Sequence, residues 1–243
     1  MIGVLVNTAA ILLGGVIGLI VNKGLPKRLT SAVMIGVGLC TIYIGLDGAL
    51  QGENTLVLVL SIVLGVAAGT ALRIDDRLNS LGRKLDERFS RSSGDLTKFG
   101  GRAPISQGFV TGSILFCVGP MAILGSITAG LGGDNSTLFI KSVIDLISAA
   151  MFAVSLGVGV LFSAASVFVY QGLLVLLAQL LRPLLDNPAL FAEMICAGSM
   201  VIIALGLNLI GVSKIKVADF LPAIVFAPAI AALMEVMGFL QMG

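Results

Sequence analysis

Long apolar runs separated by short polar stretches form the main pattern of this chain. Each run holds roughly 18 or more residues nearly free of charge, the length that one helix needs to cross about 30 Å of hydrocarbon. The pattern therefore predicts an all-α protein, a bundle of about seven or eight transmembrane helices. The predicted spans cover residues 2–21, 31–50, 55–72, 106–131, 142–160, 164–182, 189–211 and 217–240.

The region from 142 to 182 allows two interpretations, because Asp145 is its one charged residue before Arg182. It holds either two spans joined by a tight turn or one long kinked helix. A turn is favoured by Gly157, Gly159, Ser163 and Ser166. We therefore expect two spans.

Composition agrees with a lipid environment. Hydrophobic residues make up 57% of the 243 residues and charged residues 12%, with a mean hydropathy of +1.09. A soluble domain of this length has too little interior to bury so much apolar surface, so the expected partner is a lipid bilayer. The net charge of +2 is divided among short connections rather than gathered on one face, which argues against nucleic acid as a partner.

The distribution of Lys and Arg predicts an orientation. With the N-terminus outside, thirteen of the fifteen basic residues fall in inner loops, at 23–28, 73–102 and 214–216. The two exceptions, Lys141 and Arg182, are assigned to outer loops. With eight spans, both termini lie outside.

The inner segment 73–104 is the longest polar stretch. Apolar residues recur there at helical spacing between Ile74 and Phe89, which predicts an amphipathic helix on the cytoplasmic membrane surface. This helix either packs over the loops or serves as a partner site. Ser90 to Gly101 is expected to form a flexible linker.

A shift of about 161 residues aligns the first three spans with the last three. It matches Gly45-Leu46-Asp47 with Gly206-Leu207-Asn208. Two spans separate the triplets, so the triplets must cross the membrane in opposite directions, as in the inverted repeats of secondary transporters. We therefore divide the single membrane domain 1–243 into a first triplet (1–72), the cytoplasmic segment (73–104), a central broken-helix pair (105–162) and a second triplet (163–243).

Ionisable residues inside hydrocarbon cost several kcal/mol unless they are paired or hydrated, so each is a candidate functional position. Asp145 is the clearest, with Ser148 and Ser155 further along the same predicted helix. Glu193 is similar, one turn inside its span. For both carboxylates the alternative is a position near enough to the interface to reach water. No Lys or Arg is placed deep in a predicted span, which favours a cation or a neutral solute over an anion.

Asp47 and Asn208 occupy matching ends of paired spans, and Asp47 is expected at the interface. Asp219 and Glu235 are expected to extend to water from the ends of the last span.

Gly119 and Pro120 interrupt the fourth predicted span near its middle. Proline removes a helix hydrogen bond and frees carbonyl groups, which protein, water or an ion must then satisfy. Discontinuous helices of this kind form ion and substrate sites in transporters, although a plain kink is the alternative. Asn7 and Thr8 offer further polar ligands, and Asn7 is also suited to interhelical hydrogen bonding. The predicted substrate or ion-binding residues are Asn7, Thr8, Asp47, Gly119, Pro120, Ser126, Asp145, Ser148, Ser155, Glu193 and Asn208.

The pairs Gly14/Gly18 and Gly65/Gly69 have the small-xxx-small spacing of closely packed helices. Packing within the chain is the first interpretation, and a homodimer interface is the alternative. The chain contains no His and no nucleotide-binding or nucleophile motif, so we expect neither an enzyme nor a cofactor, and the sequence leaves a bound metal undecided.

The run from Gly119 to Ser126, the segment Lys141 to Asp145 and the opening Gly3 to Thr8 together resemble the YqgA/YdfK-like family of uncharacterised bacterial membrane proteins. The resemblance extends over nearly the whole chain. It implies a multi-pass protein of the bacterial inner membrane with a general transport label, and it brings no established substrate or site residue.

Two hypotheses for function follow. The first is a secondary transporter or channel for a small solute or ion, in which inverted halves alternate around a site near the midplane. The alternative is a non-transporting membrane scaffold or regulator that acts through its cytoplasmic segment.

Overall fold

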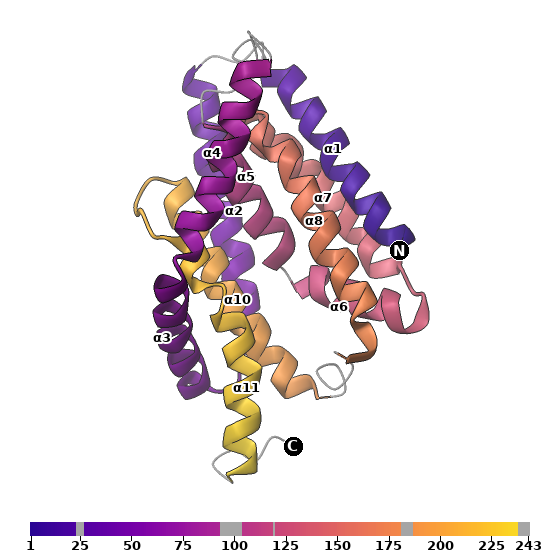
Figure 1. Cartoon of the computed structure of the whole chain (residues 1–243), viewed down its shortest axis with the longest axis vertical. Helices are drawn as coiled ribbons and strands as arrows, with labels where there is room; N and C mark the ends of the chain where they lie inside the picture. The colour runs from indigo at the N-terminus through magenta and orange to yellow at the C-terminus, as the bar shows by residue number, and fades with distance from the viewer. Residues whose placement is uncertain (23–26, 93–103, 119, 181–186, 238–243) are drawn as a thin grey trace. The chain divides into compact units, whose positions relative to one another are not determined.

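The computed structural model describes residues 1–22, 27–92, 104–118, 120–180 and 187–237, and its regular elements are all helical (Figure 1). The all-α prediction is confirmed. In chain order the elements are α1 Ile2–Asn22, α2 Lys27–Ala49, α3 Thr55–Leu72, α4 Ile74–Ser92, α5 Ile105–Val118, α6 Pro120–Gly132, α7 Ser136–Leu156, α8 Gly159–Leu176, α10 Pro188–Leu209, the 3-10 turn η2 Val217–Phe220 and α11 Ala223–Val236.

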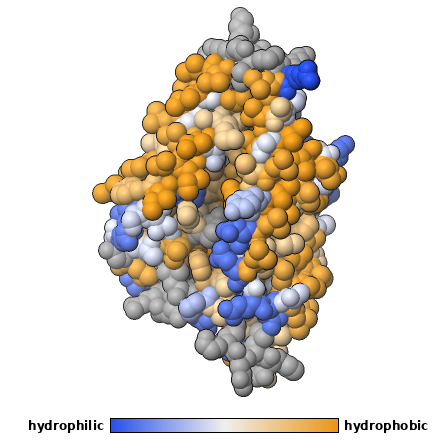
Figure 2. Space-filling view, turned by 180° about the vertical axis from the view of Figure 1, so that it is seen from behind, coloured by the Kyte–Doolittle hydropathy of each residue, from blue (hydrophilic) through white to orange (hydrophobic). Residues whose placement is uncertain are grey.

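Seven segments of the described chain are long and apolar enough to span a bilayer, and an eighth is obtained if the bent pair α5 and α6 is one span. This agrees with the predicted seven or eight. Large hydrophobic side chains such as Tyr43, Val169 and Val225 are 65–72% exposed on these segments, as expected for surfaces that face lipid. Figure 2 shows hydrophobic residues over most of the face that it displays.

Several predicted boundaries change. The span predicted at 106–131 is two short helices, α5 and α6, bent by 57° where α6 starts with Pro120. Proline suits the first position of a helix because its missing N–H has no helical partner there. The predicted pair at 142–182 is confirmed as two helices, α7 and α8, separated by Gly157 and Val158. Helix α7 starts at Ser136 rather than at 142, which changes the environment of Lys141.

The chain divides into two compact units. Unit 1 comprises residues 1–37, 77–117 and 121–179, and in it α1 packs along α7 and α8. A Cβ atom at Gly14 would collide with the carbonyl oxygen of Leu146, and one at Gly18 with that of Ala150. The first small-xxx-small pair thus serves packing within the chain, because only glycine lets the two backbones come so close.

Helix α5 also belongs to unit 1 and packs on α8. A Cβ atom at Gly108 would lie 3.0 Å from the Cα atom of Gly159, and Ser113 donates a hydrogen bond of 2.9 Å to Ser166.

Unit 2 comprises residues 38–76, 118–120 and 180–243, with α3 and α10 packed against α11. A Cβ atom at Gly65 would lie 2.5 Å from the backbone nitrogen of Ala223, and one at Gly69 would collide with the carbonyl oxygen of Asp219. The second small-xxx-small pair therefore also packs helices of the same chain.

The predicted amphipathic helix is present as α4, which follows α3 after Arg73 in a left-handed conformation (φ 51°). Asp219 is 4% exposed and accepts a hydrogen bond of 2.9 Å from the backbone N–H of Asp75. The prediction that Asp219 extends to water is therefore wrong, because its carboxylate caps the start of α4. The helix continues to Ser92, beyond the predicted linker start at Ser90, and the rest of that linker lies outside the described residues.

Candidate functional site

Four buried polar side chains meet in unit 1, from three different helices. Lys141 and Asp145 lie on α7 and are each 5% exposed, while Asn7 of α1 and Gln171 of α8 are fully buried. Charged and amide groups in such surroundings are costly unless they serve a purpose, so this group is the candidate functional site. We call it the α1/α7/α8 cluster.

Lys141 and Asp145 form an ion pair one helical turn apart. The ammonium group of Lys141 also lies 5.9 Å from the ring centroid of Phe116 on α5, within the range of a cation–π interaction. Phe116 packs edge-on against Phe152 of α7, with the ring centroids 6.3 Å apart. The expectation that no Lys or Arg lies deep in a span does not hold for Lys141, which is buried within α7. Lys141 was assigned to an outer loop, whereas α7 starts five residues before it and its charge is neutralised locally.

The two amides are only partly satisfied. Asn7 donates through Nδ2 to Gln171 Oε1 at 3.2 Å, and its side chain lies within electrostatic range of the Asp145 carboxylate. Among the described residues, Asn7 Oδ1 and Gln171 Nε2 are buried with no hydrogen-bond partner. Exchanging O and N in both amides leaves one oxygen and one NH₂ group unpaired again. Each unmet group costs about 1–3 kcal/mol, so a water molecule or a ligand is needed to complete the cluster.

The packing of α1 explains how Asn7 reaches this position. Gly14 and Gly18 hold α1 close to α7, and the backbone N–H of Gly3 donates to Asn135 Oδ1 at 3.0 Å, just before α7 begins. Contacts at both ends of α1 therefore place Asn7 beside Asp145.

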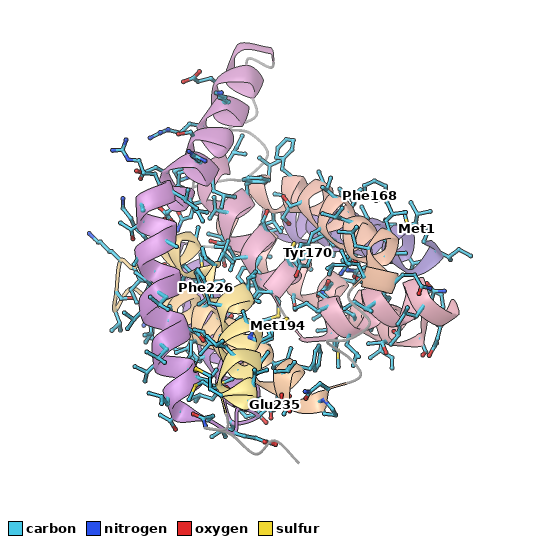
Figure 3. The ribbon with its side chains drawn as sticks, turned by 60° about the horizontal axis from the view of Figure 1, so that its bottom comes forward. Met1, Phe168, Tyr170, Met194, Phe226 and Glu235 are labelled. Carbon is cyan, nitrogen blue, oxygen red and sulfur yellow. The ribbon has the colours of Figure 1, made fainter. Side chains whose placement is uncertain are left out.

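The end of α5 also reaches the cluster. Cys117, the residue after Phe116, lies within electrostatic range of both Lys141 and Asp145. Tyr170, labelled in Figure 3, precedes Gln171 on α8 and lies within range of Cys117. The interruption between α5 and α6 therefore comes soon after Phe116 and Cys117, which lie near the cluster. Gly119 itself and the side chain of Pro120 lie outside the described parts.

The other predicted residues of unit 1 are satisfied within their own helices or stand apart. Thr8 donates to the carbonyl oxygen of Val4 at 2.8 Å, and Ser126 to that of Ala122 at 2.6 Å. Ser155 is buried with a hydroxyl that has no partner among the described residues, and Ser148 is half-buried on α7. The structure gives none of these four a contact with the Lys141–Asp145 pair.

Glu193 in unit 2 connects two elements. It is 1% exposed, and its Oε1 accepts the backbone N–H groups of Glu53 at 2.8 Å and Asn54 at 2.7 Å, at the start of α3. The carboxylate of Glu193 is buried and holds the loop between α2 and α3. Its Oε2 has no partner among the described residues.

Asn208 and Asp47 have different environments despite their matching positions. Asn208 holds the loop after α10, because its Oδ1 accepts from Ser213 and from the backbone of Ile215, and its Nδ2 donates to the carbonyl oxygen of Ile215. Asp47 is exposed near the end of α2. Asn208 thus stabilises a loop within unit 2.

Two members of the cluster, Lys141 and Gln171, were missed from the sequence. The spacing of Lys141 and Asp145 by four residues was a usable signal for a helical ion pair. The signal for Gln171 was an amide inside an otherwise apolar run.

Comparisons with known proteins give one family. The family model described as "Protein of unknown function (DUF554)" matches residues 2–232. The "Uncharacterized membrane protein YdfK" of Bacillus subtilis (strain 168) is 27% identical over 242 residues, covering 98% of this chain and 99% of the relative. The "Uncharacterized protein YqgA" of Escherichia coli (strain K12) is 30% identical over 231 residues, covering 95% and 96%. No solved structure matches the chain. The predicted resemblance is confirmed.

Proposed function

This chain belongs to the DUF554 family of membrane proteins, and from that premise we propose that it is a secondary transporter or channel for a small polar solute, with the α1/α7/α8 cluster as its binding site. The observation that carries the proposal is the buried Lys141–Asp145 pair beside two incompletely bonded amides. Membrane segments retain such expensive groups where a substrate or ion passes. A purely structural helix contact would be served as well by apolar residues.

We also infer an inverted repeat, and symmetric contacts between α2 and α10 support it. A Cβ atom at Gly45 would lie 2.6 Å from Ile203 Cγ1 and 3.0 Å from the carbonyl oxygen of Ser199. A Cβ atom at Gly206 would lie 2.6 Å from Ile42 Cγ1 and 3.0 Å from the carbonyl oxygen of Gly38. A shift of 161 residues relates the two sets of contacts. The equivalent positions are Gly38 and Ser199, Ile42 and Ile203, and Gly45 and Gly206.

The same shift pairs α1 with α8 and α3 with α11, and both pairs are in contact. Each runs antiparallel: Asn7 meets Gln171 while Gly15 meets Leu161, and Gly65 meets Ala223 while Gly69 meets Asp219. An inverted repeat requires equivalent helices to run in opposite directions, and these two pairs do so. The amides of the cluster lie across α1 and α8, the first helices of the two triplets, and transporter sites are formed at such repeat interfaces.

In this proposal, movement of α1 relative to α7 and α8 opens the cluster alternately to either side, and the short helices α5 and α6 cover it. The protein acts in the inner membrane of a bacterium and catalyses no chemical reaction.

Proteoliposomes supplied with an isotopically labelled extract of bacterial small molecules test the proposal without prior choice of a solute. Mass spectrometry should find at least one solute that accumulates above protein-free vesicles. Asp145→Asn should reduce its uptake about tenfold or more, since a lost charged hydrogen bond is worth about 1.5–3 kcal/mol.

Asp134→Asn is the matched control. Asp134 is exposed before α7, and asparagine can still accept the hydrogen bonds from the backbone and hydroxyl of Ser136. Uptake by this variant should equal that of the parent. Equal uptake by the Asp145 variant, or no uptake by the parent, would contradict the proposal.

The scaffold alternative depends on α4, which is tied to η2 through Asp75 and Asp219. Deletion of residues 80–100 distinguishes the two functions. If the protein is a transporter, the deletion variant should still take up solute in proteoliposomes. If it is a scaffold, the deletion should abolish its cellular phenotype, and neither the parent nor the variant should transport solute.

A further inference from the structure

The α1/α7/α8 cluster presents donors and acceptors in equal number. The donors are the ammonium group of Lys141 and Nε2 of Gln171, and the acceptors are the carboxylate of Asp145 and Oδ1 of Asn7. The two amide atoms have no partner among the described residues, although both side chains are fully buried. A ligand that completes the cluster must therefore both accept and donate hydrogen bonds.

Charge balance restricts the ligand further. Lys141 is the one basic residue in the candidate spans of the described chain, and Asp145 is the one acidic group paired with it. A simple anion bound to Lys141 would leave the Asp145 carboxylate buried without its counter-ion. A simple cation bound to Asp145 would leave the Lys141 ammonium group buried without its counter-ion. Removing one partner from a buried pair costs several kcal/mol. Cys117 and Tyr170, the other titratable groups near the cluster, carry no charge in their ordinary forms at neutral pH and supply no counter-ion.

A ligand that carries both charges avoids this cost. We propose that the cluster recognises a small zwitterion, whose carboxylate binds Lys141 and Gln171 Nε2 and whose ammonium group binds Asp145 and Asn7 Oδ1. The ion pair within the protein closes when the ligand leaves, so no net charge is buried in either state. This inference names the class of solute for the proposed transport function. Binding of the zwitterion does not depend on that function, but its movement across the membrane after binding does.

A single water molecule also donates and accepts, and it would satisfy the two amides without disturbing the ion pair. Water and a zwitterion differ in one measurable respect. Only the zwitterion uses both charges, so only its binding depends on Lys141 and Asp145.

The test uses the full chain in lipid nanodiscs with glycine, L-alanine and γ-aminobutyrate as probes. Each probe is paired with its methyl ester, which keeps the cation, and its N-acetyl derivative, which keeps the anion. Binding is measured by equilibrium dialysis of the radiolabelled probe and by the shift in Tm. At least one zwitterion should bind. Its two singly charged derivatives should bind more weakly by a factor of about ten or more, equivalent to about 1.4 kcal/mol or more.

The double variant Lys141→Met with Asp145→Asn removes both charges together and so avoids an unpaired buried ion. It should remain monodisperse with a cooperative thermal transition, and it should lose zwitterion binding. Gln171→Leu should weaken binding about tenfold by removing one hydrogen bond to a charged group. Asp134→Asn should bind as the parent does.

Three results would overturn the inference: no probe binds the parent, a singly charged derivative binds as tightly as its zwitterion, or the double variant binds as the parent does. The first result is what a water-filled cluster would give. Failure of the transport function can be distinguished from failure of this inference. If a zwitterion binds but proteoliposomes do not accumulate it, the inference stands and the transport function is contradicted. If other solutes are taken up but no zwitterion binds, the transport function stands and this inference is contradicted.

Discussion

The most informative residue is Lys141, because a lysine inside a membrane helix requires an explanation. Its partner Asp145 is one turn away on α7, and the Phe116 ring lies beside its ammonium group. Burial of both charges removes their hydration, which the pairing only partly repays. The pair is therefore better explained by a role in binding than by a contribution to stability.

The pair should behave as a unit in stability measurements. Lys141→Met leaves the Asp145 carboxylate buried without a counter-ion and should lower the free energy of unfolding by about 3–5 kcal/mol. Adding Asp145→Asn should restore most of that loss. Unfolding followed by circular dichroism, for both single variants and the double variant, measures the coupling. Additive effects of the two substitutions would show that the residues do not interact.

Glu193 shows a different use of a buried carboxylate. Its Oε1 accepts two backbone N–H groups at the start of α3, so its acceptor atom matters more than its charge. Glu193→Ala should cost about 1–3 kcal/mol and speed hydrogen exchange at Glu53 and Asn54, because both N–H groups lose their acceptor. Glu193→Gln keeps an acceptor oxygen and should cost much less. Exchange rates at the two amides, measured by mass spectrometry, test this, and equal acceleration by both substitutions would count against it.

At the scale of elements, glycines decide which helices can touch. In α1, Gly14 and Gly18 face carbonyl oxygens of α7, whereas Gly36 of α2 has open space where a Cβ atom would be. The same residue type is thus closely packed in α1 and faces open space at position 36 of α2.

Gly18→Ala should therefore push α1 away from α7 and lower Tm. The cost should be about 1–3 kcal/mol or more, as for other additions to a packed interface. Gly36→Ala is the matched control and should be neutral or stabilise by about 0.5–1 kcal/mol through its higher helix propensity. Thermal unfolding of the two variants in one detergent makes the comparison. Equal changes in Tm would mean that α1 does not pack as described.

The junction of α4 with η2 should depend on pH. Burial raises the pKa of Asp75, while its hydrogen bond from Ala218 acts in the opposite direction. A carboxyl group with a raised pKa in the folded state stabilises the fold at low pH, and this contribution is lost as the pH rises above the ordinary value of 3.8.

We therefore expect hydrogen exchange at residues 74–78, corrected for its intrinsic rate, to become slower as the pH is lowered from neutral toward 4. Asp75→Asn keeps an acceptor for Ala218 but cannot titrate, so the pH dependence should disappear in that variant. A pH dependence of the same size in both proteins would assign the effect to another group.

At the scale of the whole chain, the basic residues predict which loops share a side of the membrane. Single cysteines at Arg28 and Lys214, in a variant without Cys40, Cys117 and Cys196, should react with a membrane-impermeant thiol reagent only from the cytoplasmic side. Cysteines at Asp47 and Asp134 should react only from the opposite side. Labelling of positions 28 and 214 from different sides would contradict both the orientation and the inverted repeat.

Some features of the fold and site follow from short stretches of sequence. Apolar runs predict the spans, the Gly119-Pro120 pair predicts the break between α5 and α6, and Asp145 stands out as a carboxylate within hydrocarbon. Lys141 was misplaced because a basic residue near a predicted span end is normally assigned to a loop. The structure shows that α7 begins earlier and that Asp145 makes the buried position tolerable.

The sequence by itself determined that this chain lies in lipid as a helical bundle, because hydrophobicity and helix length are properties of contiguous residues. Only the tertiary structure decided that Asn7 meets Gln171, 164 positions away, and that Asn7 lies near Asp145 of α7. Contacts of this kind depend on how closely two helix backbones approach each other. Glycines permit a close approach, but no local sequence pattern specifies which helices will pair. The physical reason is that solvation acts on each segment separately, whereas a binding site requires particular segments to pack together.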